Sequence, residues 1–258
     1  MTKPIGFFDS GVGGTSIWKE VHQLLPSEDT IYLADSANAP YGVRAKEEIL
    51  RLSIKNTEIL LKHDCKLIVV ACNTATTNAI AYLRANYQVP FIGIEPAIKP
   101  AALQTNTKKV GILATKGTLS SSLFSSTSKM FAAGIEVLEQ EGTGLVELIE
   151  AGKVNSDETK ELLKTHLQPM LDEGIDHLVL GCTHYPYLIP VLRQIVPNTV
   201  LIIDSGEAVA RQTKAILEQN GLLASLRPSQ HRFYSNAELT VLEQLVGGGN
   251  TAVEYLQF

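Results

Sequence analysis

Eight short apolar runs alternate along this chain with stretches whose apolar residues recur at helical spacing. The runs are rich in β-branched and aromatic residues, and they lie at 5–8, 30–33, 67–71, 91–94, 110–113, 135–138, 178–180 and 200–203. Residues 47–61 and 158–171 show the helical spacing, although Pro169 should end or kink the second helix. Strands that alternate with helices predict an α/β fold of parallel sheets covered by helices on both faces.

A weak internal repeat predicts that the chain has two similar halves. Residues 7–11 (FFDSG) resemble residues 202–206 (IIDSG), and two cysteine-containing segments also resemble each other. Each half has about the usual size of a domain. We therefore expect a first α/β domain, interrupted by a second one, with these boundaries: 1–96 plus 207–258, and 97–206.

Composition and charge narrow the possible functions. The net charge of −5 comes from dispersed residues, and the longest basic cluster is Lys108-Lys109, so nucleic-acid binding has little support. No apolar stretch has membrane-spanning length, and residues 4–8 look like a strand instead of part of a signal peptide. Three cysteines do not resemble a disulfide framework. We expect a cytoplasmic protein with reduced thiols and no membrane partner.

Two cysteines stand at the ends of two of the predicted strands. Cys72 ends the apolar run 66–71 and precedes Asn73-Thr74, whereas Cys182 ends the run 177–181 and precedes Thr183-His184. In parallel α/β sheets, ligands bind beyond the carboxyl ends of the strands. Two thiols at such positions could face one substrate from opposite sides, as a reaction that removes and returns a proton at one carbon requires.

Thiols suit this proton chemistry because the reference pKa of cysteine, about 8.5, lies close to neutral pH. One thiol can accept a proton as thiolate while the other donates. Asn73, Thr74 and Thr183 are uncharged groups that could hold a carboxylate, and backbone amides at helix N-termini would add positive potential. Asp9 and His184 could exchange protons with the thiols.

Each of these residues also has a simpler structural interpretation. A buried cysteine is usually a small hydrophobe, which fits Cys65. His184 could be an ordinary loop histidine, and Asp9 could cap a helix that begins near Gly13 or Gly14. The glycine-rich turn at residues 11–14 suggests dinucleotide binding, but it lacks the full glycine spacing.

A metal site is a further alternative. Cys182 and His184 have one residue between them, and Cys72 could supply a third ligand. Structural zinc sites usually pair closely spaced ligands twice, and the chain has no second pair. It also has no Cys-x-x-Cys motif, which argues against a redox dithiol. We therefore predict no metal.

Four motifs together resemble the bacterial glutamate racemases of the aspartate/glutamate racemase family. Their order and spacing match across nearly the whole chain, and the two cysteine motifs are the specific ones. The motifs are 6–14 (GFFDSGVGG), 40–42 (PYG), 71–75 (ACNTA) and 181–186 (GCTHYP).

The resemblance implies an isomerase that interconverts L- and D-glutamate without a cofactor or metal and supplies D-glutamate for peptidoglycan. It also implies two α/β domains related by a pseudo-twofold axis, with the active site in the cleft between them. A homodimer is expected because such two-domain sites close. We expect no dependence on a peptidoglycan precursor as activator, because the chain begins only a few residues before its first strand.

The resemblance also assigns roles to individual residues. Cys72 would take the α-proton of D-glutamate with help from Asp9, and Cys182 that of L-glutamate with help from His184. Glu150 would be the family's second-site glutamate, although Glu147, one helical turn away, could be its equivalent. The remaining residues would bind the substrate. Tyr41 and Gly42 would lie near its side-chain carboxylate with Ser10 also in contact, and Asn73, Thr74 and Thr183 would hold the α-carboxylate. Thr115 and Thr118 resemble the family's substrate loop in the second domain, although a structural turn would explain them equally well.

Three other functions stay open at this point. A relative with the same two-thiol chemistry could act on aspartate, hydantoins or a related acid. A binding protein could close two domains on an acidic ligand and keep its cysteines inert. A zinc enzyme is the third alternative.

Overall fold

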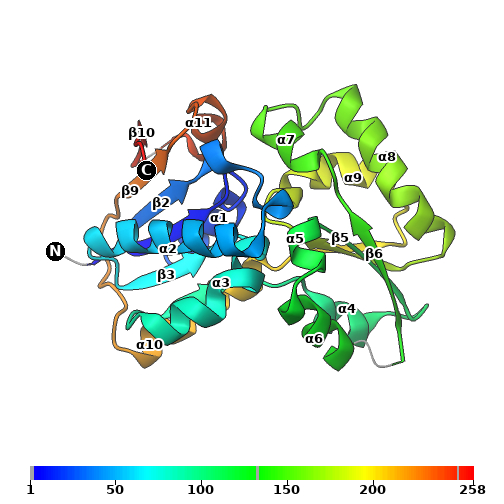
Figure 1. Cartoon of the computed structure of the whole chain (residues 1–258), viewed down its shortest axis with the longest axis horizontal. Coiled ribbons are helices and arrows are strands. Elements are labelled where there is room, and N and C mark those ends of the chain that lie inside the picture. Colours follow the sequence, from blue (N-terminus) through cyan, green and yellow to red (C-terminus); the bar gives the residue numbers. More distant parts are fainter. Residues whose placement is uncertain (1–2, 132–133, 249) are drawn as a thin grey trace.

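The computed structural model describes residues 3–131, 134–248 and 250–258. It contains two sheets, each made of parallel strands, that lie beside each other (Figure 1). The first sheet has the strand order β10-β9-β2-β1-β3-β4. Its strands are β1 (Ile5–Asp9), β2 (Thr30–Ala34), β3 (Leu67–Val70), β4 (Phe91–Gly93), β9 (His231–Ser235) and β10 (Thr251–Tyr255). All neighbouring pairs are parallel.

The second sheet has the order β6-β5-β7-β8 and is also parallel throughout. Its strands are β5 (Lys109–Ala114), β6 (Glu136–Glu141), β7 (His177–Gly181) and β8 (Leu201–Ile203). The eight predicted runs all overlap strands, so the predicted parallel α/β fold is confirmed. The chain crosses to the second sheet after β4 and returns after β8; the domain boundaries stay predictions.

The two sheets repeat one topology, because β2-β1-β3-β4 corresponds in order to β6-β5-β7-β8. Cys72 follows β3 and Cys182 follows β7, so the two cysteine segments occupy equivalent positions. The other two segments of the predicted repeat do not occupy equivalent positions. Residues 7–11 include the end of the interior strand β1, whereas residues 202–206 include the end of the edge strand β8.

Alternating side chains of the first sheet face two helical layers. Phe7 and Val69 pack with α1 (Thr15–Leu24), α10 (Gly206–Gln219) and α11 (Thr240–Val246). Phe8 and Val70 pack on the other face with α2 (Lys46–Lys62) and α3 (Asn73–Asn86). This period of two is what a strand covered on both faces produces.

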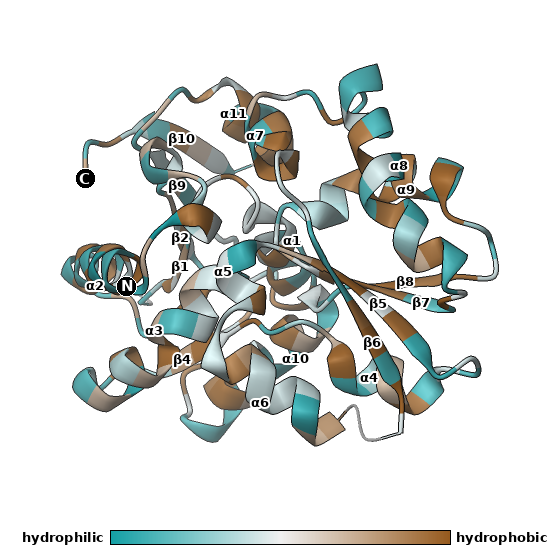
Figure 2. Cartoon of the chain, turned by 45° about the vertical axis from the view of Figure 1, so that its right-hand side comes forward, coloured by the Kyte–Doolittle hydropathy of each residue, from teal (hydrophilic) through white to brown (hydrophobic). Residues whose placement is uncertain are grey.

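The second sheet is covered in the same way. Leu113, Leu178 and Leu180 face α7 (Leu145–Glu150), α8 (Asp157–Asp172) and α9 (Ile189–Ile195). Val110 and Ile112 face α4 (Ile98–Gln104) and α6 (Ser122–Phe131), which follows the short α5 (Lys116–Leu119). Figure 2 shows hydrophobic residues concentrated in the strands and on the helix faces that cover them.

Pro169 does not end α8, which continues to Asp172. Met170, directly after the proline, is buried in the same core as Leu163 and Leu167. Burial of this apolar face maintains the last helical turn, although proline removes one backbone donor. In the described part of the chain, no helix is both long and apolar enough to cross a membrane.

Candidate active site

A small cavity lies between the two sheets, at the carboxyl ends of their strands. Its empty space, including the solvent at its opening, is about 240 Å³. Both halves contribute to its wall, which consists of Ser10, Pro40, Tyr41, Gly42, Cys72, Asn73, Thr74, Thr115, Val146, Cys182, Thr183 and His184. The structure therefore brings most of the predicted site residues together on one cavity.

The two thiols enter this cavity from equivalent positions in the two halves. Cys72 is the N-cap of α3, where its Sγ accepts a hydrogen bond from Ala75 N at 3.5 Å and lies 3.8 Å from Ser10 Oγ. Burial and the nearby Asp9 carboxylate raise the pKa of Cys72 well above its usual value. Cys182 follows β7, and its Sγ lies 3.8 Å from His184 Nδ1. Both cysteines are free and buried.

Asp9 lies at the end of β1, fully buried next to the cavity wall. Its Oδ2 accepts a hydrogen bond from Gly14 N at 2.8 Å, just before α1 begins, and lies 4.0 Å from His184 Nδ1. Its Oδ1 lies 3.5 Å from Thr183 Oγ1, which comes from the other half. Burial raises the pKa of Asp9, although the charge of His184 opposes this. Asp9 thus holds the chain at the start of α1 and also faces the site.

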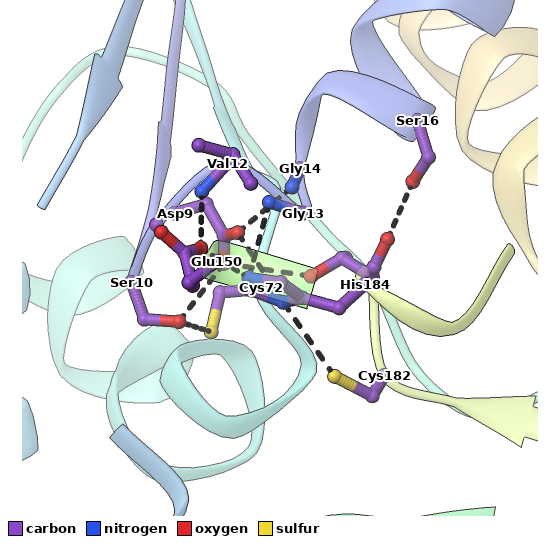
Figure 3. A network of polar contacts seen from close by, with 12 residues as sticks. Asp9, Ser10, Val12, Gly13, Gly14, Ser16, Cys72, Glu150, Cys182 and His184 are labelled. Carbon is purple, nitrogen blue, oxygen red and sulfur yellow. Dashed lines mark hydrogen bonds and ion pairs between the residues drawn. The ribbon is translucent and has the colours of Figure 1, made fainter. Parts of the chain in front are cut away.

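His184 connects the second thiol to a carboxylate. Its Nε2 lies 2.5 Å from Glu150 Oε1 and 3.2 Å from Gly13 N (Figure 3). Burial alone would lower the pKa of His184, but hydrogen bonds to Cys182 and Glu150 and the charge of Asp9 raise it well above the usual value. The raised pKa favours a protonated Nε2 that donates to Glu150, and such a proton opposes the hydrogen bond that Gly13 N donates to an unprotonated Nε2.

Glu150, at the end of α7, has three donors around its carboxylate. Oε1 accepts hydrogen bonds from Val12 N at 2.6 Å and from His184, and Oε2 accepts one from Ser36 Oγ at 2.9 Å. Glu147, the alternative, is exposed and lines a neighbouring cavity. The geometry therefore favours Glu150 as the glutamate beside the second thiol.

Steric constraints explain why glycine occupies two positions in the turn at residues 11–14. A Cβ at Gly11 would overlap the Glu150 carboxylate, and one at Gly13 would overlap the His184 ring. Only glycine lets the first half approach these second-half side chains so closely. This close approach explains the glycines without any dinucleotide.

Threonine hydroxyls join the halves on another side of the cavity. Thr74 Oγ1 lies 2.8 Å from Thr115 Oγ1 and 3.3 Å from Thr118 Oγ1. Thr115 lines the cavity, whereas Thr118 is fully buried behind it. Gly42 packs against Thr115, where an added Cβ would come within 2.7 Å of the threonine Cβ.

The side chains of Asn73 and Tyr41 differ in whether their polar atoms already have hydrogen-bond partners. Neither Nδ2 nor Oδ1 of the buried Asn73 has a hydrogen-bond partner among the described residues. Such unpaired buried groups are costly unless a ligand satisfies them. The Tyr41 hydroxyl, in contrast, donates to Asp35 Oδ2 at 2.5 Å and accepts from Asn56 Nδ2 at 3.1 Å. Tyr41 lines the cavity with its hydroxyl already engaged.

Sequence reasoning missed several contacts that join the halves. Ser36 binds Glu150, Ser16 Oγ donates to Thr183 O at 2.8 Å, and Thr15 Oγ1 lies 2.5 Å from Tyr187 OH. Ser36 directly follows Asp35 at the end of β2, so the rule for strand ends could have found it. The other two lie on helical segments, where no local pattern distinguishes them.

The arrangement of acidic, histidine and cysteine side chains also bears on metal binding. Within residues 3–131, 134–248 and 250–258, no three such side chains are grouped to hold a metal ion. The predicted independence of metal and cofactor remains a prediction.

Comparison with known proteins gives consistent similarities over almost the whole chain. Residues 13–213 match the family model described as Asp/Glu/Hydantoin racemase. A glutamate racemase of Ectopseudomonas mendocina is 46% identical over 94% of this chain and 93% of its own. One of Herpetosiphon aurantiacus is 48% identical over 86% of this chain and 87% of its own.

Solved structures show the same similarity in three dimensions. Glutamate racemase isoform RacE1 of Bacillus anthracis has a TM-score of 0.87 at 30% identity, covering 99% of this chain and 97% of that one. The Escherichia coli glutamate racemase in complex with L-glutamate and the activator UDP-MurNAc-Ala has a TM-score of 0.86 at 35% identity, covering 99% and 98%.

Proposed function

The chain belongs to the Asp/Glu/hydantoin racemase family, and we propose that it interconverts L- and D-glutamate by proton transfer between two thiols. The observation that carries the proposal is the placement of Cys72 and Cys182 at equivalent strand ends on one cavity. The predicted family is confirmed, and with it the isomerase class. The roles of individual residues below are proposals.

In the direction from D- to L-glutamate, the Cys72 thiolate removes the α-proton and the Cys182 thiol returns one to the opposite face. The reverse direction exchanges these roles, so the enzyme ends with one thiol and one thiolate in either case. The raised pKa of Cys72 keeps it protonated in the resting enzyme, ready to act as the donor for L-glutamate. The imidazolium of His184, 3.8 Å from Cys182 Sγ, would stabilise negative charge on that sulfur.

The carbanion-like state needs donors that are in place before the reaction. The unpaired amide of Asn73 supports a role in holding the α-carboxylate, together with Thr74 and Thr183. The N-terminus of α3, capped by Cys72, adds positive potential at the same place. Burial of both thiols supports exclusion of water from the proton transfer.

For the side-chain carboxylate of glutamate, we propose that Tyr41 and Gly42 form one side of the binding site with Ser10 and Thr115. Because the Tyr41 hydroxyl is bound to Asp35, the tyrosine would contribute its ring and backbone instead of that hydroxyl. The buried Thr118 would act through Thr74 and Thr115, to which it is hydrogen-bonded.

Further parts of the proposal concern the protein's context. The product D-glutamate would serve peptidoglycan synthesis, in the cytoplasm, where two catalytic thiols stay reduced. We also propose a homodimer, which sedimentation equilibrium of the purified protein would test. The domain division at residues 96 and 206 would place the hinge of the site where the chain crosses between the sheets.

The test is α-proton exchange in deuterium oxide, followed by NMR on dialysed protein with chelator and no added cofactor. We expect exchange with both glutamate enantiomers and none with L-aspartate. Exchange with aspartate alone would change the substrate and keep the mechanism. No exchange with any of the three, from folded protein with reduced thiols, would overturn the proposal. Loss of activity with chelator would contradict its independence of metal.

A further inference from the structure

Ser36 stands outside the set of residues that the family motifs single out, yet it touches the site's acidic side chain. It begins the short turn Ser36–Asn38 directly after β2, on the first half. Its Oγ donates to Glu150 Oε2 at 2.9 Å, and Glu150 ends α7 on the second half. The bond therefore exists only while the two halves are together around the cavity.

The first half fixes Ser36 firmly. Asp35 N donates to Asp9 O at 3.0 Å, and Ala37 N donates to Asn236 Oδ1 at 2.9 Å, so both neighbours of Ser36 are anchored. Asn38 Nδ2 also donates to Asp35 Oδ1 at 2.7 Å. The hydroxyl is thus presented to the second half from a rigid turn.

The two carboxylate oxygens of Glu150 have different partners. Oε1 accepts hydrogen bonds from His184 Nε2 at 2.5 Å and from Val12 N at 2.6 Å. Within the described residues, the donor to Oε2 is Ser36. Hydrogen bonds to both oxygens fix the plane of the Glu150 carboxylate. With hydrogen bonds to Oε1 alone, the carboxylate could turn and move Oε2 to other positions. The direction of the hydrogen bond to His184 depends on that plane.

We propose that Ser36 is a positioning residue that acts through Glu150 and His184 on proton transfer at Cys182, and not at Cys72. The inference rests on the proposed function of the site. Glu150 is 16% exposed, so water can replace the lost donor but cannot fix the carboxylate plane. We therefore expect a moderate loss of rate and not its abolition.

The experiment compares Ser36→Ala with Ser36→Thr, which keeps the hydroxyl. Ser126→Ala is the matched control, because Ser126 Oγ also makes a 2.9 Å hydrogen bond, to Leu123 O, on an exposed helix away from the site. Each protein is assayed with L- and D-glutamate, both protiated and deuterated at the α-carbon. Thermal unfolding shows that each variant is folded.

Ser36→Ala should lower kcat/KM by about three- to tenfold, equally in both directions, because the enantiomers have equal free energy. The isotope effect on kcat/KM should rise for L-glutamate, whose α-deuteron Cys182 removes, and fall for D-glutamate. Ser36→Thr and Ser126→Ala should resemble the unsubstituted protein. In a Glu150→Ala background, Ser36→Ala should have no further effect.

Unchanged kcat/KM in Ser36→Ala would overturn the inference. So would isotope effects that change alike for both enantiomers, which is the signature of a merely structural defect, or an additional loss in the Glu150→Ala background. Absence of racemisation by the unsubstituted protein would instead overturn the proposed function, so the two failures are distinguishable.

Discussion

At the scale of single residues, each thiol of the site has a different electrostatic neighbour. Cys72 lies beside the buried carboxylate of Asp9, which disfavours its thiolate, whereas Cys182 lies beside the imidazolium of His184. The two sulfurs therefore face different charges, although both belong to cysteine side chains. Under the proposed mechanism, L-glutamate requires the proton on Cys72 and D-glutamate requires it on Cys182, so the two directions meet different surroundings at the sulfur that accepts the proton.

Substitution of either thiol tests this division. Cys72→Ser and Cys182→Ser should each lower racemisation by about 10²- to 10⁴-fold, because a serine hydroxyl is too weak an acid to replace a thiol in proton transfer. Folding should change little, since serine is nearly isosteric and its hydroxyl finds polar neighbours at both places, Ser10 Oγ beside Cys72 and His184 Nδ1 beside Cys182. Racemisation is followed by circular dichroism of glutamate, and unfolding by urea titration.

Cys65→Ser provides the matched control for this pair. Cys65 is buried in the core of the first half and does not line the cavity, and burial raises its pKa to about 12, so we expect it to take no part in proton transfer. We expect it to lose stability and not turnover. Near wild-type racemisation by Cys72→Ser or Cys182→Ser would contradict the assigned mechanism.

The residues of the site differ in how far sequence could predict them. Asp9, Cys72 and Cys182 directly follow predicted strands, so the strand-end rule predicts that each lies at the carboxyl edge of its own sheet. Ser36 and the Val12 N–H reach Glu150 only because of how the two halves dock, and no local pattern encodes that docking. The same holds for the engagement of Tyr41 by Asp35.

At the scale of elements, the two ends of the strands have different tasks. The carboxyl ends carry the site, and the amino ends carry a buried ion pair. Lys66 Nζ, just before β3, lies 2.6 Å from Glu28 Oε2, just before β2, and both side chains are almost fully buried. Lys66 also donates to Leu222 O, and Glu28 accepts from Ala224 N, so the pair fastens the segment after α10 to the sheet.

Removal of one partner should therefore destabilise the fold without affecting turnover. Lys66→Met leaves the Glu28 carboxylate buried and unpaired, which should lower the free energy of unfolding by about 3 kcal/mol in urea. Lys66→Met with Glu28→Gln should recover part of this loss. Lys153→Met is the control, because its partner Glu158 is exposed and the pair should contribute little. A similar loss in both single variants would contradict the argument.

The sequence predicted the strands that have an apolar run and missed β9 and β10, which have none. β1, β3, β5 and β7 are covered on both faces and appear as continuous apolar runs. β9 begins with His231 and Arg232, and β10 is a half-exposed edge strand that contains Glu254, so neither has such a run. Their places in the sheet come from pairing with β2 and with each other, which is a tertiary effect.

At the scale of the whole molecule, the polar network of the site is also the junction of its two halves. Asp9 belongs to the first sheet, and Cys182, His184 and Glu150 belong to the second half. A protonated imidazole of His184 at this junction would contribute to the stability of the folded protein as well as to the proposed proton transfer. The titration of His184 should therefore appear in unfolding of the whole protein.

The direction of that pH dependence follows from the raised pKa of His184. Between the unfolded value of about 6.5 and the higher folded value, the folded protein holds a proton that the unfolded chain has released. The stability contribution is therefore complete below pH about 6.5 and declines above it, by up to about 1.4 kcal/mol per pH unit. Above pH about 8.5, release of the Cys72 proton in the unfolded chain acts in the same direction, so the informative window ends there.

Urea unfolding between pH about 6.5 and about 8.5 measures this decline. His184→Asn keeps a polar group at the junction but cannot carry the proton, so its free energy of unfolding should be lower at pH about 6.5 and fall less steeply with pH. His166→Asn is the control, since that histidine lies on α8, away from the cavity. Parallel curves for the unsubstituted protein and His184→Asn would show that His184 is neutral in the folded state, and the imidazolium would have to be removed from the mechanism.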